Sequence, residues 1–241
     1  MPIVSENFNT LLLNLEKLLG AAPKEEIISV PKMNKEEGDM KIIEMPHPIV
    51  FIVKDTKTGL EEIKNYLGPK NAAFLEKEAE ERLSGEGHNP GTAWRLDENR
   101  WASKLDADGQ FDYTYSERMH THFPFRGILS LFRQDTKSRR LFLPIWSGYD
   151  STRMMGGEGR PIQVPCTIGF YLYYHGVWKE QKGYLVLTQV MRSLDLGGCV
   201  TNDLYLGARL LDYFATKLCI RKTELRLVAL NPFYPIEGGN V

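Results

Sequence analysis

Cys166 occupies the kind of position in which a nucleophilic thiol is found. It follows Pro165 and leads into the aromatic run TIGFYLYYH, which predicts a buried strand with the sulfur at its entrance. A thiolate attacks electron-poor carbon atoms, and a nearby arginine lowers the thiol pKa and so favours the thiolate. Most free cysteines in apolar segments are buried and inert. The hypothesis therefore depends on the charged residues that flank the strand.

Two groups of arginine and serine residues could hold an anion beside this thiol. Each group lies about 26 residues from Cys166, one upstream and one downstream. Guanidinium groups offer forked donors that match phosphate oxygens. An isolated Arg-Arg pair at a turn is usually a solvated surface feature, but two groups around a strand cysteine predict a phosphate bound near a nucleophile. The members are Ser138, Arg139 and Arg140 upstream, and Arg192 and Ser193 downstream.

The composition argues against several classes of function. The 30 basic and 31 acidic residues nearly cancel, so no global field favours nucleic acid or a membrane surface. No apolar run reaches the roughly 18 residues that a membrane span needs. The three sparse cysteines indicate reduced thiols, and hence a cytoplasmic protein (in the host cytoplasm if phage-encoded). Apart from His120-x-His122 the histidines show no ligand spacing, so we expect no metal.

The expected elements indicate a single domain over residues 1–241 in which strands and helices are mixed. Apolar stripes predict helices, Gly68-Pro69 is expected to break one of them, and Thr201-Asn202 is expected to cap another. The strand that begins near Cys166 is expected to pair with 182–193 as a hairpin. The remaining expectations are helical segments at 5–19, 59–84 and 201–217, strands at 47–55, 138–146 and 225–230, a turn at 36–39 and a loop at 85–100.

The order of these motifs resembles that of the thymidylate synthase family. In that family a Ser-Arg-Arg turn precedes a strand that ends in tryptophan, a Pro-Cys strand carries the nucleophile, and an Arg-Ser-x-Asp run follows. Here the turn begins at Ser138, the strand ends at Trp146, and the last run ends at Asp195. The resemblance covers roughly residues 70–235 and is strongest from 138 to 212.

Three further residues match the family's active site by their spacing. The family's catalytic glutamate opens a helix of the form E-L-L-W-F-L-x-G, and Glu78 opens EAEERLSG with leucine and glycine at the matching offsets. Glu80 takes that role if the alignment of the helix slips. The family's tryptophan, eight residues before a glycine, matches Trp101. Its active-site tyrosine, six residues after that glycine, matches Tyr115.

Asp203 distinguishes two branches of the family. Thymidylate synthases have an asparagine eight residues after the aspartate of the Arg-Ser-x-Asp run, where its amide reads N3–H and O4 of uracil. Counting eight residues from Asp195 gives Asp203, and the run VTNDLYLGARLLD resembles the deoxycytidylate hydroxymethylases. Cytosine presents an amino donor where uracil presents an acceptor, so a carboxylate suits it, and a buried polar mismatch costs about 1–3 kcal/mol. If the alignment slips by one residue, Asn202 reads uracil instead.

The sequence also departs from the family pattern. Thr167 replaces the histidine after the nucleophile, and Tyr171 replaces a glutamine five residues beyond it. The sugar-binding His-x-Tyr pair has only Tyr234 as a counterpart, and the segment that closes the synthase site has none. The choice between ribose and deoxyribose therefore stays open, and so does a member that binds nucleotide without catalysis.

The resemblance implies an α+β fold, with a large twisted mixed sheet packed against helices and one sheet face forming a homodimer interface. It implies one-carbon transfer from 5,10-methylenetetrahydrofolate to C5 of a pyrimidine nucleoside monophosphate, here dCMP to 5-hydroxymethyl-dCMP. The alternatives are a thymidylate synthase that methylates dUMP and a CMP-specific enzyme. The implied roles are attack on C6 by Cys166; action on the base by Glu78, Tyr115 and Asp203; nucleotide binding by Arg192, Ser193, Tyr234 and the partner subunit's Arg139 and Arg140; and folate contacts by Trp101 and Asp195.

Overall fold

The computed structural model describes residues 2–20, 27–31, 39–45, 47–121, 125–156, 163–178 and 182–235. Its strands are β1 (Pro2–Ser5), β2 (Ile27–Pro31), β3 (Asp39–Glu44), β4 (Ile49–Val53), β5 (Phe142–Pro144), β6 (Thr167–Val177), β7 (Lys182–Asp195) and β8 (Thr223–Pro235). Its α-helices are α1 (Phe8–Gly20), α2 (Thr56–Leu83), α3 (Glu98–Trp101), α4 (Tyr115–Thr121), α5 (Phe125–Gln134), α6 (Gly148–Gly156) and α7 (Val200–Lys217). The short 3-10 helices η2 (Ala93–Asp97) and η3 (Ala102–Lys104) flank α3.

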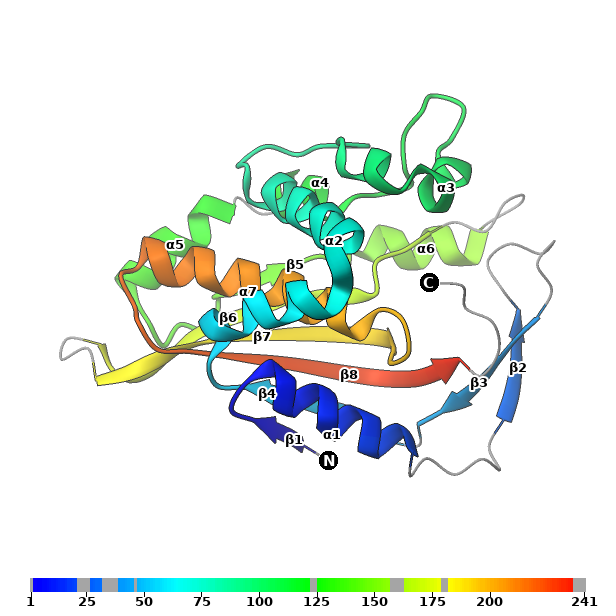
Figure 1. The fold of residues 1–241 in the computed structure, drawn as a ribbon. Helices are drawn as coiled ribbons and strands as arrows, with labels where there is room; N and C mark the ends of the chain where they lie inside the picture. The colour runs from blue at the N-terminus through cyan, green and yellow to red at the C-terminus, as the bar shows by residue number, and fades with distance from the viewer. Residues whose placement is uncertain are drawn as a thin grey trace.

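The described strands form one mixed sheet (Figure 1). Its order is β1-β4-β8-β7-β6-β5, and the β2–β3 pair joins the far end of β8. β1 runs parallel to β4, and β7 runs parallel to β8; the other neighbouring pairs are antiparallel. This sheet and its helices confirm the predicted α+β class. The pairing of β6 with β7, in which Leu172 faces Leu187, confirms the predicted hairpin pairing.

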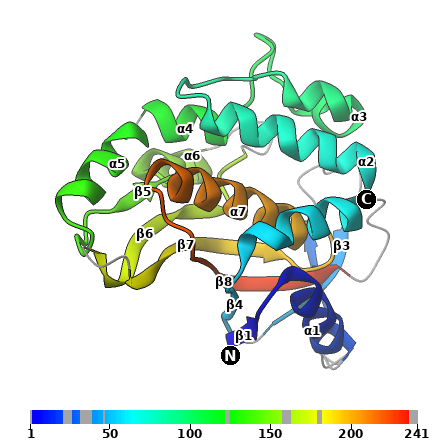
Figure 2. The same cartoon turned by 60° about the vertical axis from the view of Figure 1, so that its left-hand side comes forward.

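Helices α2 and α7 lie side by side across one face of the sheet (Figures 1 and 2). Strand residues alternate between faces, and in the middle of β8 the alternate residues Leu225, Leu227 and Ala229 are fully buried beneath these helices. Helix α7 turns Leu204, Leu211 and Phe214 into the same core, as its apolar stripe predicts. This packing fixes the first turn of α7 relative to the ends of β6 and β7.

The opposite face of the sheet carries aromatic and aliphatic side chains that are only half-buried. Tyr171 and Tyr173 of β6 stack with ring centroids 5.7 Å apart. Arg226 of β8 lies 5.8 Å from the Tyr173 ring, Val228 is half-buried, and Leu230 is exposed. The two faces therefore differ sharply in solvent exposure, although both present large side chains.

Helix α2 bends at Gly68-Pro69, where the sequence predicts a break. Gly68 has φ 74° and ψ 165°, a conformation that residues with a side chain rarely adopt. The ring of Pro69 removes a backbone donor and crowds the preceding turn. The bend gives the second half of the helix its own direction, and it is this half that carries Glu78.

Several short elements differ from the sequence-based expectations. Strand β1 precedes the first helix, the β2–β3 pair forms where the sequence predicts only a turn at 36–39, and α6 follows Trp146. The expected loop at 85–100 turns helical from Ala93, and the expected strand at 138–146 shortens to β5. Short elements carry too few residues for a clear period, so tertiary contacts decide them. The turn expected at 36–39 lies largely outside the described residues.

The predicted cap of α7 is wrong. Cys199, not Thr201 or Asn202, is the N-cap residue, and no side-chain hydrogen bond caps this helix. The helix begins earlier because the backbone N–H of Cys199 already donates to the carbonyl of Asp195 over 3.2 Å. The turn between β7 and α7 is therefore shorter than predicted from Thr201 and Asn202.

None of the helices in the described ranges combines the length and apolar character needed to cross a bilayer. The same ranges hold no group of three or more His, Cys, Asp or Glu side chains that could bind a metal ion.

Candidate active site

Cys166 lies at the entrance to β6, beside the end of β7. Its carbonyl oxygen accepts a hydrogen bond of 2.9 Å from the backbone N–H of Arg192, and its thiol is half-buried. Burial raises the pKa of this thiol above the ordinary value; Arg192 opposes the rise and Asp203 adds to it. Arg192 is therefore the neighbour that favours the thiolate.

The side chain of Arg192 is fixed against the loop that carries Cys166. Its Nε donates to the carbonyl of Pro165 over 3.1 Å, and its guanidinium carbon lies 5.5 Å from the centre of the Trp146 ring. Ser193 follows on β7, opposite Asn231 of β8. The structure thus places the downstream arginine beside the cysteine, as its spacing in the sequence suggests, with Ser193 one residue further along β7.

Glu78 and Tyr115 are joined through Arg82. Glu78 and Arg82 lie one turn apart on α2, and both Nε and Nη2 of Arg82 donate to Oε1 of Glu78, Nε over 3.1 Å. The guanidinium carbon also lies 4.0 Å from the centroid of the Tyr115 ring. Burial disfavours the charge on Arg82, but Glu78 and Tyr115 outweigh it and raise its pKa. The three side chains form a compact charged and aromatic unit.

The neighbouring glutamates have other partners. Glu80 is exposed and pairs with Lys77 over 3.0 Å on the solvent side of α2. Oε1 of Glu81 accepts hydrogen bonds from the backbone N–H groups at 92–93, at 2.5 and 2.9 Å. Of the two glutamates that the sequence offers for the family's position, Glu78 therefore faces the site and Glu80 does not.

A hydrogen-bonded chain runs from Tyr115 into the core. Its hydroxyl donates to Oγ1 of Thr167 over 3.4 Å and accepts from the Thr167 backbone N–H over 3.3 Å. Nε2 of the buried Gln189 donates to the same Oγ1 over 3.2 Å. Burial raises the pKa of Tyr115 to about 12, with Asp203 and Cys166 adding to the rise. Tyr115 is therefore a neutral phenol that can donate a proton in a hydrogen bond.

Asp203 lies in the first turn of α7 and is half-buried. Burial raises its pKa to about 7; Arg82 opposes this rise, while Glu78 and Asp195 add to it. The Oδ1 of Asp195 accepts from the backbone N–H groups at 197–198, at 2.8 and 3.0 Å, and so shapes the turn that leads to Asp203. The carboxyl of Asp203 can thus exist in either protonation state near neutral pH.

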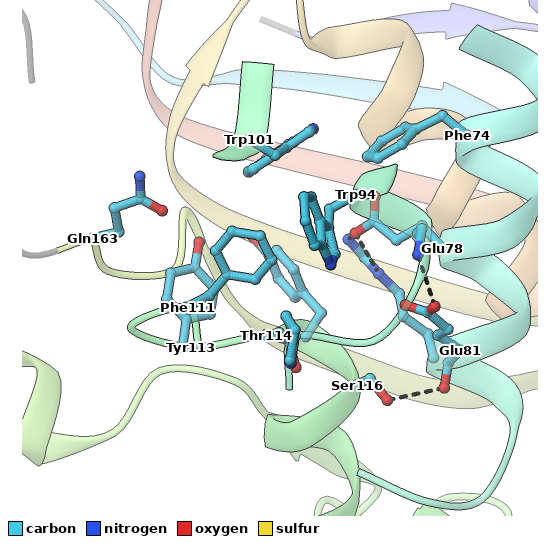
Figure 3. A pocket seen from close by; sticks show the side chains of 14 residues that line it. Phe74, Glu78, Glu81, Trp94, Trp101, Phe111, Tyr113, Thr114, Ser116 and Gln163 are labelled. Atoms are coloured by element: carbon cyan, nitrogen blue, oxygen red, sulfur yellow. Dashed lines mark hydrogen bonds and ion pairs between the residues drawn. The ribbon is translucent and has the colours of Figure 1, made fainter. Parts of the chain in front are cut away.

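An aromatic cavity opens beside Glu78 and Arg82 (Figure 3). Trp101 stacks on Phe74 with centroids 6.0 Å apart and meets the edge of Phe111 at the same separation. The indole Nε1 atoms of Trp94 and Trp101 are buried without a hydrogen-bond partner among the described residues. The stacked and edge-on rings of this cavity suit a flat heteroaromatic ring. Its lining is completed by Glu81, Pro90, Ala93, Tyr113, Thr114, Tyr115, Ser116 and Gln163.

Three of the predicted site residues do not reach Cys166 within the same chain. Arg139 and Arg140 are exposed in the turn before β5. The carbonyl oxygen of the next residue, Leu141, accepts a hydrogen bond from the backbone N–H of Leu172. Leu172 lies six residues after Cys166, a separation of roughly 20 Å at the rise of a strand. Tyr234 lies on β8 in a separate pocket that Asn202 also lines.

Two buried polar residues of the site, Arg82 and Gln189, are not predicted by the sequence motifs. The family's helix motif has phenylalanine at the position of Arg82. A charged residue at a position that is otherwise apolar could have indicated a buried polar contact there. Gln189 carried a similar signal, as an amide side chain in the largely apolar run YLVLTQVM. In both cases only the fold shows what the side chain contacts.

Comparison with known proteins identifies the fold. No family model matches the sequence, and no curated protein matches it. The structure is similar to a solved structure of thymidylate synthase from T4 phage, with a TM-score of 0.64 over 93% of this chain and 76% of that chain. The two sequences are 13% identical. The chain therefore has a thymidylate synthase-like fold, as its motifs predict, and the chemistry must be argued from its own residues.

Proposed function

We propose that this protein transfers a one-carbon unit from 5,10-methylenetetrahydrofolate to C5 of dCMP and so forms 5-hydroxymethyl-dCMP. The observation that carries this proposal is the hydrogen bond of 3.3 Å that the backbone N–H of Thr167, the residue after Cys166, donates to the hydroxyl of Tyr115. This contact brings the phenol to the nucleophile, and Asp203 is near enough to raise the pKa of both groups. A nucleophile, a proton donor and a base-reading carboxyl are the groups that this reaction requires. The likeness to a thymidylate synthase supports the same class of chemistry.

The covalent step belongs to Cys166. Attack of its thiolate on C6 moves the C5–C6 electron pair to C5, which then bonds to the one-carbon unit. When bound, the folate supplies that unit at the oxidation level of formaldehyde and departs as the leaving group. A water held between Glu78 and Tyr115 takes the C5 proton. Water then adds to the exocyclic methylene of the nucleotide, and loss of the thiolate from C6 restores the ring double bond without any oxidant or reductant.

The preference for cytosine is assigned to Asp203. A neutral carboxylic acid, like an amide, offers one donor and one acceptor and can turn to meet either base, so the discrimination comes from the ionised form. A carboxylate only accepts, so it binds the N4 amino group of cytosine but opposes O4 of uracil. An amide at this position offers the complement of uracil. Substituting Asp203→Asn is therefore expected to shift the preference from dCMP toward dUMP by about tenfold or more.

The aromatic cavity beside Glu78 is the candidate site for the pterin ring of the folate. Its stacked and edge-on rings suit a flat heterocycle. Trp101 would then contact the pterin directly, and Asp195 would act through the turn that it shapes. These assignments follow from the chemistry of the cavity lining.

We assign the phosphate to Arg192 and Ser193, together with Arg139 and Arg140 of the partner subunit in a homodimer. The exposed position of both upstream arginines supports this, because they are available to a second molecule. The half-buried sheet face that carries Tyr171 and Tyr173 is a suitable interface for two copies of the chain. Tyr234 is the candidate for contact with the sugar.

The test is tritium release from [5-³H]dCMP, [5-³H]dUMP and [5-³H]CMP in the presence of methylenetetrahydrofolate, with the product mass recorded in the same reactions. Release from dCMP with a hydroxymethyl mass is the expected result. Release from dUMP alone with a methyl mass would indicate a thymidylate synthase with a divergent base-reading turn. Release from CMP alone would indicate a ribonucleotide enzyme, and release from none would leave a nucleotide-binding protein without this activity.

A further inference from the structure

Arg82 is a buried cation at a position where the helix could have carried an apolar side chain. Its side chain is 9% exposed, whereas Lys77, five residues earlier on α2, is 43% exposed. Both take part in ion pairs along the same helix, Lys77 with Glu80 and Arg82 with Glu78. A surface ion pair needs no explanation, but a buried guanidinium must be compensated by several well-placed partners.

The partners of Arg82 are groups of the candidate active site. Its guanidinium binds the carboxylate of Glu78 through two donors and lies flat over the ring of Tyr115. The positive charge of Arg82 also lowers the pKa of Asp203, whereas the negative charges of Glu78 and Asp195 raise it. A single side chain thus touches the two groups assigned to proton removal and influences the third, which reads the base.

We propose that Arg82 is a positioning residue that holds the carboxylate of Glu78 and the phenol of Tyr115 in one fixed arrangement, so that a water between them is aimed at C5 of the nucleotide. The inference rests on the proposed function for its chemistry. The arrangement of Arg82, Glu78 and Tyr115 can be tested in the protein without any substrate. Because the backbone N–H of Thr167 donates to the hydroxyl of Tyr115 over 3.3 Å, any displacement of the phenol should be felt at that N–H.

The main variant is Arg82→Met, which keeps most of the length and apolar volume of the side chain and removes the forked donors. We expect kcat for tritium release to fall by about 10- to 100-fold, because a misplaced base loses most of the benefit of proton transfer. The KM for dCMP should change less than about threefold, since Arg82 touches no assigned phosphate ligand. Lys77→Met is the matched control, an identical loss of charge on the solvent side of the same helix, and should leave kcat unchanged.

Two further variants separate positioning from a merely structural role. Arg82→Lys keeps the charge but loses the planar fork, so it should restore only part of kcat. The double variant Glu78→Gln with Arg82→Met should lose less than the product of the two single effects, because part of the Arg82 effect passes through Glu78. A further fall in kcat that multiplies the two single effects would overturn the proposal.

The decisive measurement independent of turnover is the ¹H–¹⁵N correlation peak of the Thr167 amide in the folded protein. It should move in Arg82→Met toward its position in Tyr115→Phe and stay in place in Lys77→Met. If Arg82→Met does not fold, Arg82→Lys serves in the same comparison and should move the peak in the same direction. An unmoved Thr167 peak together with full kcat would overturn the inference. If the wild-type protein releases no tritium from any nucleotide, the proposed function fails, and the Thr167 peak alone decides whether Arg82 positions Tyr115.

Discussion

At the scale of single residues, Asp203 is a carboxylic acid whose protonation changes near neutral pH. Burial raises its pKa to about 7 in the folded chain from the ordinary value of 3.8. An acid whose pKa is higher in the folded than in the unfolded chain stabilises the fold most at low pH, where it is protonated in both the folded and the unfolded state. That contribution is fully present below the unfolded pKa, declines above pH 4, and is lost once the pH has risen through about 7.

Asp203→Asn is therefore expected to stabilise the protein at pH 8, because an amide carries no buried charge. The gain should be about 2 kcal/mol after allowance for partial exposure, or ~4–8 °C in Tm for a chain of this size. It should shrink at pH 5, where the wild-type carboxyl is protonated in the folded state. Thermal unfolding of both proteins at the two pH values measures the difference. An equal gain at pH 5 and pH 8 would contradict the raised pKa.

Cys166→Ser should lower kcat by at least about 10³-fold, because a serine hydroxyl without an adjacent base is a poor nucleophile. The substitution is small, so the fold and nucleotide binding should persist. Steady-state tritium release measures the loss, and Cys219→Ser, at an exposed cysteine, is the control that should retain activity. Wild-type turnover in Cys166→Ser would exclude the covalent step.

Spacing in the sequence was informative where the site is built from neighbouring strand ends. Cys166, Arg192 and Asp203 meet because β6 and β7 are adjacent and a short turn leads from β7 to α7. Arg82 and Gln189 could not be predicted in this way. Arg82 stacks on Tyr115, which lies 33 residues further along the chain, and the contact of Gln189 with Thr167 depends on the exact register of β6 against β7, so no local pattern records either contact.

At the scale of elements, the bend in α2 determines where Glu78 points. Gly68 has a positive φ, and no atom lies within 4 Å of a Cβ added there, so Gly68→Ala tests backbone conformation without a steric clash. We expect a loss of about 1–2 kcal/mol in unfolding free energy. If the helix relieves the strain by straightening, kcat should also fall. Urea unfolding and tritium release measure the two effects, and unchanged stability would show that the bend does not depend on the glycine.

Elements with strong signals were predicted and weak ones were not. The long apolar strands β6 and β7 and the stripe of α7 were visible in the sequence, as was the Gly68-Pro69 break. The β2–β3 pair, α6 and the helical turns after Ala93 were missed, since each is short and is stabilised by contacts outside its own segment. Pairing in the sheet, including the parallel alignment of β7 with β8, follows from the whole fold.

At the scale of the whole molecule, the proposed homodimer predicts that two inactive variants restore each other. Arg139→Ala with Arg140→Ala removes the arginines offered to the partner, and Cys166→Ser removes the nucleophile. A mixed dimer would hold one intact site, with Cys166 from one subunit and both arginines from the other. After subunit exchange, an equal mixture should recover up to about a quarter of wild-type activity. No recovery, in a mixture shown to contain mixed dimers, would contradict arginine sharing.

The cavity of Trp94 and Trp101 has an optical consequence. Two of the four tryptophans of the chain line the space assigned to the folate. The ammonium group of Lys104 lies 4.4 Å from the Trp101 ring, so the excited indole sits in a strong local field. A conjugated ligand stacked there would alter that field and accept excitation energy directly. The intrinsic emission of the protein should therefore report occupancy of the cavity in real time, without a label and before any chemistry occurs.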